Sequence, residues 1–289
     1  METFAYDGHT LTWEEHSPGE HTLLMLHGWS ASRRWWWRQV EQLRGMGRCV
    51  TLDLPGHYPA QAPPDFRLTQ AQLIDLETAA VRHICGGRPV TLIGHSTGGL
   101  VALGVAARLP GQVRRVICID GVVWGPLSGV LGIAQWALGR QLYPLFWAAW
   151  GASQLADWAM MGGMAFYAHD KLAHWRNPVA WEGCRLNWPW YRHISLPNLA
   201  VMLRFLAACD IRPLAATLLM PVLAVTGDHD PLVPPEQSRW LADNLPCADL
   251  VVLEKVGHMP HLEAPAALEN AIMSWLTEHP SSGLTQSTT

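Results

Sequence analysis

The chain has 289 residues, a length typical of one α/β domain with an insertion, and its 49% apolar content excludes a disordered polypeptide. Charged residues make up only 15%, so an unusual share of the surface must be uncharged. The formal charge of −4, with no basic run longer than two residues, argues against a nucleic-acid partner and favours a small-molecule substrate.

Along most of the chain, short apolar runs alternate with longer segments of helical periodicity. Strands are predicted at 3–6, 10–15, 21–27, 48–54, 89–94, 113–119, 221–227 and 250–254. Helices are predicted at 34–45, 69–85, 96–109, 235–244 and 265–278. Strands without polar alternation, such as 90–93, are typical of a sheet buried on both faces. The pattern predicts an α/β fold with a mostly parallel eight-stranded sheet, helices on both faces, and an antiparallel hairpin formed by the first two strands at one edge.

The alternation stops between residues 121 and 212, where nine of the 16 tryptophans lie. Roughly ninety inserted residues are too many for a loop, so we expect a helical cap over a core formed by 1–120 and 213–280. The uncharged stretch from Gly121 to Gly139 is long enough to span a membrane, but Pro126, Gln135 and five glycines favour an apolar lid. Residues 281–289 are expected to form a disordered tail.

The six cysteines are scattered, without the spacing of a metal site, and are expected to be free buried thiols. The first residues lack the basic and apolar regions of a signal peptide. Both features favour a cytoplasmic protein, because free thiols are typical of a reducing compartment.

The sharpest motif is G-x-S-x-G at residues 94–98, where a predicted buried strand leads directly into a helix rich in small residues. A sharp turn at this junction would lift the Ser96 hydroxyl above the sheet edge, and the two glycines would let strand and helix approach closely. The free N–H groups at the helix start favour negative charge where an oxyanion would form. The simpler interpretation is that Ser96 only caps the helix.

Several motifs in this order resemble the α/β-hydrolase superfamily, in particular its esterase-like and lipase-like members with a helical cap. They are His27-Gly28-Trp29, Asp53-Leu-Pro-Gly56, Gly94-His-Ser-Thr-Gly98, Gly227-x-x-Asp230 and Gly257-His258-x-Pro-His-Leu-Glu. The resemblance spans about residues 21–265. It implies a catalytic triad in the chain order Ser, acid, His.

His258, in a loop after the last predicted strand, is expected to be the general base for Ser96, with His261 as the local alternative. The resemblance selects Asp230 as the acid that would orient His258. Asp228 is the near alternative and would brace the turn, and Asp120 is a second, since some members of the superfamily carry the acid at that strand.

The oxyanion hole requires two backbone donors. One is expected to be the Thr97 N–H, directly after the nucleophile, and by resemblance the second is the Trp29 N–H, with Gly28 allowing the close turn. The Ser30 hydroxyl could assist. We expect Trp29, Trp124 and Trp188 to bind substrate, although most cap tryptophans are expected to pack the cap against the core.

These features predict a serine hydrolase of the carboxylesterase or lipase type, acting on apolar, uncharged esters through an acyl-enzyme. No cofactor or metal is expected. The alternatives are a carbon–carbon bond hydrolase of aromatic degradation with the same triad, and a non-catalytic ligand-binding homologue. The expected partner is a small apolar ester, without nucleic acid or an integral membrane span. Interfacial contact through the cap and the oligomeric state stay open.

Overall fold

A computed structural model describes residues 1–280 of the chain; the predicted tail at 281–289 lies outside this range. Within residues 1–280, eight strands form one sheet in the order β1-β2-β4-β3-β5-β6-β7-β8. They are β1 (Glu2–Tyr6), β2 (His9–Glu15), β3 (Thr22–Leu26), β4 (Arg48–Leu52), β5 (Val90–His95), β6 (Val113–Ile119), β7 (Val222–Gly227) and β8 (Ala248–Leu253). The pairs β1–β2 and β2–β4 are antiparallel, and the neighbours from β4 to β8 are parallel.

The predicted fold class is confirmed, and each strand begins and ends within two residues of its predicted limits. All residues of strands β3 to β7 are buried except Arg114, because helices cover both faces of these strands. Side chains alternate between the faces: Leu23 and Met25 belong to one core cluster, and Leu24 and Leu26 to the other.

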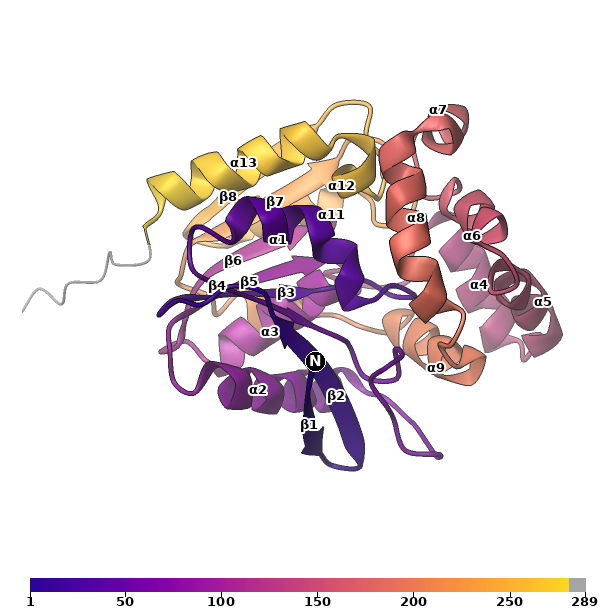
Figure 1. Ribbon diagram of the computed structural model, residues 1–289, viewed down its shortest axis with the longest axis horizontal. Coiled ribbons are helices and arrows are strands. Elements are labelled where there is room, and N and C mark those ends of the chain that lie inside the picture. Colours follow the sequence, from indigo (N-terminus) through magenta and orange to yellow (C-terminus); the bar gives the residue numbers. More distant parts are fainter. Residues whose placement is uncertain (281–289) are drawn as a thin grey trace, which may run out of the picture.

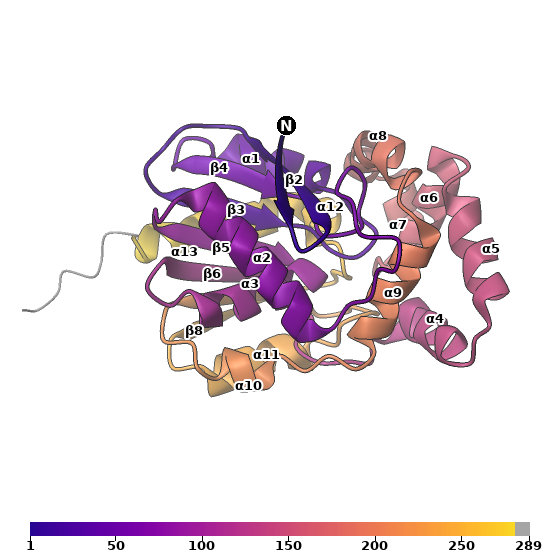
Figure 2. The same ribbon diagram turned by 90° about the horizontal axis from the view of Figure 1, so that it is seen from below.

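Helices lie on both sides of this sheet, as the two views show (Figures 1 and 2). The helices on one face are α1 (Trp37–Leu43) and α13 (Pro265–Glu278), and those on the other are α2 (Gln70–Cys85), α3 (Thr97–Arg108) and α11 (Glu236–Asn244). Two shorter helices are α10 (Arg212–Ala215) and α12 (Pro260–Glu263). Thr69 and Gln72 form a capping box at the start of α2, and Gly86 ends it in the left-handed conformation.

The predicted helix at 34–45 differs in its first turn, which is the 3₁₀ helix η1 (Arg33–Trp36) followed by α1. The Arg33 backbone N–H donates to Asp53 Oδ1 at 2.8 Å, and the Arg33 guanidinium pairs with the same carboxylate. This tertiary contact holds the chain near the end of β4, so that the first turn is a 3₁₀ helix instead of a regular α-helix. The contact cannot be read from the local sequence, because Asp53 is distant from Arg33 in the chain.

Between β6 and β7 the chain forms α4 (Gly129–Gly139), α5 (Tyr143–Ser153), α6 (Asp157–Met164), α7 (Lys171–Arg176), α8 (Pro178–Tyr191) and α9 (Leu196–Leu206). We call residues 129–206 the cap. It covers the edge of the sheet where the parallel strands end, with α8 and α9 next to the core and α5 farthest from the sheet (Figure 2). Up to Pro280, no helix is both long and apolar enough to cross a membrane; the uncharged stretch weighed above is divided between a loop and α4.

Candidate active site

Ser96 lies at the sharp turn between β5 and α3, at the edge of the sheet beneath the cap. Its backbone has φ 55° and ψ −116°, a conformation that costs an L-residue about 1–3 kcal/mol. The turn depends on glycine on both sides. A Cβ on Gly94 would lie 2.1 Å from the Gly98 carbonyl oxygen, and a Cβ on Gly98 would lie 2.1 Å from the Leu26 carbonyl oxygen. The G-x-S-x-G spacing thus lets β5, α3 and β3 pack without side chains between them.

His258 and Asp230 complete a hydrogen-bonded succession with this serine. The distance from His258 Nε2 to Ser96 Oγ is 3.0 Å, and that from His258 Nδ1 to Asp230 Oδ2 is 2.7 Å. All three residues are buried. The structure therefore brings together three side chains that sequence reasoning selected from distant parts of the chain.

The hydrogen bonds of Asp230 determine which proton positions this succession can have. Asp230 Oδ1 accepts the N–H groups of Leu232 at 2.8 Å and Val233 at 3.0 Å, which leaves Oδ2 facing His258. An ionised carboxylate can only accept, so His258 Nδ1 carries the proton. Nε2 is then the acceptor for the Ser96 hydroxyl, which is the arrangement a general base requires.

The alternative acids occupy supporting positions. Asp228 accepts the Val256 N–H at 3.2 Å, so it braces the loop that leads to His258. Asp120 Oδ1 accepts the Gly227 N–H at 2.9 Å, while its Oδ2 has no hydrogen-bond partner among the described residues. Burial raises the pKa of Asp120 well above its usual value, and the nearby Asp230 carboxylate raises it further, so both effects favour the neutral carboxyl.

His261 also lies away from the serine hydroxyl. Its ring packs edge-on against Trp35 and His95, with both centroid distances 4.8 Å. Burial and three neighbouring histidines hold its pKa well below the usual value. In this arrangement it is a neutral packing residue behind the site.

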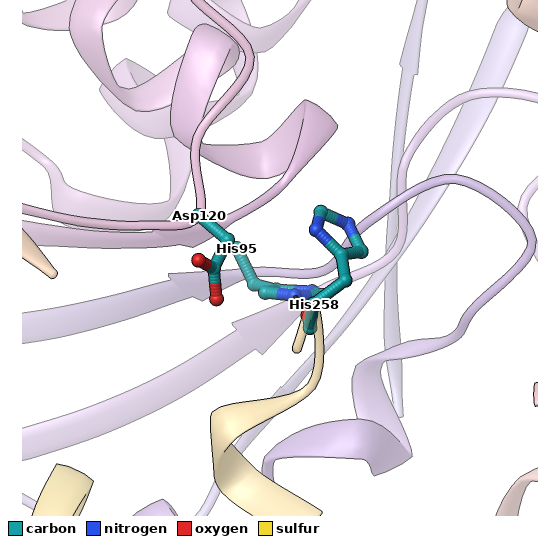
Figure 3. Close-up of side chains that lie close together, drawn as sticks. All are labelled: His95, Asp120 and His258. Carbon is teal, nitrogen blue, oxygen red and sulfur yellow. Dashed lines mark hydrogen bonds between the residues drawn. The ribbon is translucent and has the colours of Figure 1, made fainter. Parts of the chain in front are cut away.

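Three ionisable side chains, those of His95, Asp120 and His258, lie close together (Figure 3). Their nearest ligand-type atoms lie within 4.8 Å of one another, the one such cluster in the part of the chain that the structure describes. His95 Nε2 bonds the His258 carbonyl oxygen at 2.8 Å, and burial lowers the pKa of His95 to about 3. Both ring nitrogens of His258 already have partners in Ser96 and Asp230. The hydrogen bond from His95 to the His258 carbonyl supports the loop that carries His258.

The two backbone amides expected to form the oxyanion hole, those of Trp29 and Thr97, have no acceptor within the described residues. Thr97 is the first residue of α3, whose first amides have no acceptor inside the helix. A Cβ on Gly28 would lie 3.0 Å from Ser96 Cβ, so glycine allows the loop after β3 to approach Ser96 closely.

The orientation of the Trp29 amide depends on His27, to which sequence reasoning assigned no role. The Leu54 N–H donates to His27 Nε2 at 3.0 Å, so the ring proton is on Nδ1, which donates to the Gly28 carbonyl at 2.8 Å. That carbonyl and the Trp29 N–H belong to one planar trans peptide and point in opposite directions. The hydrogen bond from His27 that fixes the Gly28 carbonyl therefore also fixes the direction of the Trp29 N–H. Burial keeps the pKa of His27 well below its usual value and the ring neutral.

The loop carrying His258 has two further supports that were missed. Glu263 accepts the N–H groups of Gly257 at 3.0 Å and Met259 at 3.1 Å, on either side of the histidine. The His258 N–H donates to the Tyr167 carbonyl of the cap at 2.8 Å. Glu263 is the last residue of the quoted Gly257 motif, so a signal for it existed. Tyr167 lies in an insertion with no motif, and only the folded chain reveals it.

A small cavity of about 50 Å³ lies over Ser96. It is lined by Gly28, Ser96 and His258 of the candidate site and by apolar side chains that include Trp29, Leu131, Met160, Met164, Leu232 and Met259. A second cavity of about 280 Å³ adjoins it between α5 and α6 and shares Ser30, Met160, Met164 and Tyr167 as lining residues. Over the described chain, neither cavity is lined by a Lys, Arg, Asp or Glu side chain.

Of the tryptophans expected to bind substrate, Trp29 lines the cavity, and its indole N–H donates to the Leu199 carbonyl of α9 at 2.9 Å. Trp124 and Trp188 lie outside both cavities. Trp124 is held at the junction of cap and core, where its backbone bonds Gln237. Trp188 is half-buried on α8, with the Arg192 guanidinium over its ring.

Comparisons with known proteins bear on the family. Residues 23–271 match the model of the alpha/beta hydrolase family. A pimeloyl-[acyl-carrier protein] methyl ester esterase from Aromatoleum aromaticum is 30% identical over 257 residues, which cover 84% of this chain and 93% of that protein. An (E)-2-((N-methylformamido)methylene)succinate hydrolase from Acinetobacter baylyi is 26% identical over 273 residues, which cover 94% of this chain and 95% of that protein.

Among solved structures, a thermophilic esterase from Thermogutta terrifontis superposes with a TM-score of 0.74. It is 23% identical, and the alignment covers 96% of this chain and 97% of that one. At this identity the likeness shows the fold alone. The match to the family model extends over most of the sequence, and the protein is a hydrolase that belongs to the alpha/beta hydrolase family.

Proposed function

We propose that the protein is a serine hydrolase that cleaves carboxylic esters of apolar, uncharged substrates through an acyl-enzyme intermediate. The observation that carries this proposal is the hydrogen-bond succession from Asp230 through His258 to Ser96, placed directly under an apolar cavity. Each member has the hydrogen-bonding role that nucleophilic catalysis by serine requires.

In the first half-reaction, Ser96 Oγ attacks the ester carbonyl carbon while its proton passes to His258 Nε2. The carbonyl π electrons move to oxygen, and the resulting imidazolium is stabilised by the Asp230 carboxylate. The tetrahedral intermediate then expels the alcohol, which takes the proton from Nε2. In the second half-reaction a water attacks the acyl-enzyme and gives its proton to His258 Nε2, and the tetrahedral intermediate then releases the acid as Ser96 Oγ leaves and takes that proton back.

The Trp29 and Thr97 amides are the proposed donors to the oxyanion of both intermediates. Such donors act most strongly when their orientation is set before the reaction, and each one contributes a factor of about 10²–10³ in rate in well-studied acyl-transfer enzymes. Here Thr97 is oriented by the helix that it begins, and Trp29 by the hydrogen bond of His27 to the Gly28 carbonyl.

Carboxylic esters are favoured over the other bonds that this triad cleaves by the chemistry of the cavity. Cleavage of acidic dienones by a carbon–carbon hydrolase would require cationic or polar groups at the substrate, whereas both cavities are lined mainly by aliphatic and aromatic side chains. A relative with 30% identity is a methyl ester esterase, which also supports an ester substrate. The acyl group of that relative's substrate is not carried over to this chain.

The test is hydrolysis of short p-nitrophenyl esters by the wild type, by Ser96→Ala and by His258→Ala. Both variants are expected to lose turnover by at least about 10³-fold while keeping the far-UV circular dichroism of the fold. Ser274→Ala, an exposed serine of α13, serves as the matched control and should turn over like the wild type. A fluorophosphonate probe should label the wild type at Ser96. Turnover that survives in Ser96→Ala would refute the mechanism, and an unlabelled, inactive wild type would favour a ligand-binding homologue.

A further inference from the structure

The outer helices of the cap expose large apolar side chains that the proposed mechanism does not use. Of the fifteen large apolar side chains that are exposed in residues 1–280, ten lie between Ile133 and Trp175. On α4, α5, α6 and the turn between α5 and α6 they are Ile133, Trp136, Leu145, Trp147, Leu155 and Trp158, with exposed fractions from 45% to 80%. We call these six side chains the outer apolar face. A cluster of exposed apolar side chains usually marks a surface that contacts another molecule, whereas single exposed apolar side chains are common on any protein.

Helix α5 shows that this exposure is unusual. The eleven residues Tyr143–Ser153 contain no charged side chain. A helix that is apolar all round belongs in the interior of a protein or a membrane. Yet α5 packs on α4, α6 and α9 along one side only, and apart from Phe146 its side chains are half-buried or exposed. Figure 1 shows α4, α5 and α6 at the end of the molecule remote from the sheet.

The charge of the cap indicates what covers this face. Residues 129–206 carry six Lys and Arg against three Asp and Glu, a formal charge of +3, while the rest of the chain has 14 against 21, a charge of −7. Two of the cations lie directly at exposed aromatic rings of the cap: Arg140 is 4.4 Å from the Trp136 ring centroid, and Lys171 is 4.9 Å from that of Phe166. Surfaces that combine exposed Trp and Leu with Arg and Lys are typical of proteins that bind the interface between lipid headgroups and acyl chains in anionic bilayers.

The larger cavity connects this surface with the site. Four of its lining residues, Ala149, Ala152, Gly163 and Phe166, are exposed on α5 and α6 or directly after them. Its inner residues, Met160, Met164 and Tyr167, also line the cavity over Ser96. An acyl chain that enters between α5 and α6 would therefore pass from the outer apolar face toward the nucleophile.

We propose that the outer apolar face docks on an anionic membrane surface, and that the ester substrate is an amphiphile that enters from the membrane between α5 and α6. The docking is inferred only from the exposed apolar and cationic side chains of the cap, while the role in substrate delivery rests on the proposed esterase function. Membrane contact would bury the six side chains of the face, and the cations around it would interact with lipid phosphates.

The experiment is cosedimentation with vesicles, whose readout does not depend on catalysis. The wild type, Leu145→Ser/Leu155→Ser and the control Met46→Ser/Leu219→Ser are compared on phosphatidylcholine vesicles with and without 30% phosphatidylglycerol. The control residues are also exposed, by 38% and 77%, but lie before β4 and β7 at the sheet edge opposite Ser96. None of the four substituted leucine and methionine side chains lines either cavity.

We expect the wild type to bind the anionic vesicles more tightly than the neutral ones. The Leu145→Ser/Leu155→Ser variant should bind at least about tenfold more weakly, and the control should bind like the wild type. All three should hydrolyse soluble p-nitrophenyl acetate equally, so a failed esterase assay and a failed docking assay are distinguishable. Absence of vesicle binding by the wild type, or equal binding by the two double variants, overturns the proposal. A wild-type dimer that the leucine substitutions convert to a monomer in sedimentation velocity would instead assign the face to a second copy of the chain.

Discussion

Two buried carboxyl groups, those of Asp120 and Asp230, lie near His258, and replacing each with the isosteric amide tests which of them is the proposed acid. In Asp230→Asn, the amide oxygen is expected to keep accepting the N–H groups of Leu232 and Val233, because only an oxygen can fill that position. The amide NH₂ then takes the place of Oδ2 and faces His258 Nδ1. A donor at this position makes Nδ1 the acceptor and moves the ring proton to Nε2. Nε2 can then no longer take the proton of Ser96.

For Asp230→Asn the expected loss is about 10⁴-fold in kcat, equivalent to about 5 kcal/mol of transition-state stabilisation. The loss arises because His258 has the wrong tautomer, while the fold is unchanged. Asp120→Asn should behave differently. Burial favours the uncharged form of the Asp120 carboxyl, which the amide resembles, and the amide oxygen can still accept the Gly227 N–H, so kcat should fall by less than about threefold.

The assay is kcat for p-nitrophenyl butyrate, with thermal denaturation to show that both variants fold. Because the two substitutions remove the same atom type from two buried carboxyls of one site, each is the matched control of the other. A loss in Asp120→Asn as large as that in Asp230→Asn, or Asp230→Asn activity within tenfold of the wild type, would show that the hydrogen-bond reasoning is wrong.

Three further predictions concern other groups of the molecule. His27→Ala should lower kcat by about 10–100-fold with little change in KM, because it frees the peptide that aims the Trp29 amide; steady-state kinetics with a short ester measures this split. Glu77 is fully buried, and its carboxyl oxygens have no hydrogen-bond partner within residues 1–280. Burial raises its pKa to about 8. The native state therefore keeps a proton that the unfolded state releases above its usual pKa near 4.5. Wild-type stability should therefore fall as pH rises from 4.5 to 8, and Glu77→Gln should be more stable than the wild type by up to about 3 kcal/mol at pH 7 and equal to it near pH 4.5, as measured by urea unfolding. Met164→Phe, at the junction of the two cavities, should reduce kcat/KM for octanoate esters at least about tenfold more than for acetate esters in a chain-length series.

Much of the core could be predicted because its signals are local. Unalternating apolar strands with helical segments between them require a sheet covered on both faces, and β6 begins and ends at its predicted residues. The positions of Gly94 and Gly98 around Ser96 predict a close strand-to-helix turn, and the contacts that a Cβ would make there show why glycine is needed. The break in the first helix was missed because it depends on Asp53, which is distant in the sequence from Arg33.

By itself, the sequence determined the sheet, the turn that presents Ser96, and a small set of carboxylates and histidines able to meet it, because periodicity and glycine spacing act over a few neighbouring residues. Only the tertiary structure decided which carboxylate faces His258, that His27 aims the Trp29 amide, and that Trp124 and Trp188 lie away from the cavities. Hydrogen bonds require donors and acceptors to meet within about 3 Å, and that condition is met or missed by how distant segments pack, which no local pattern records.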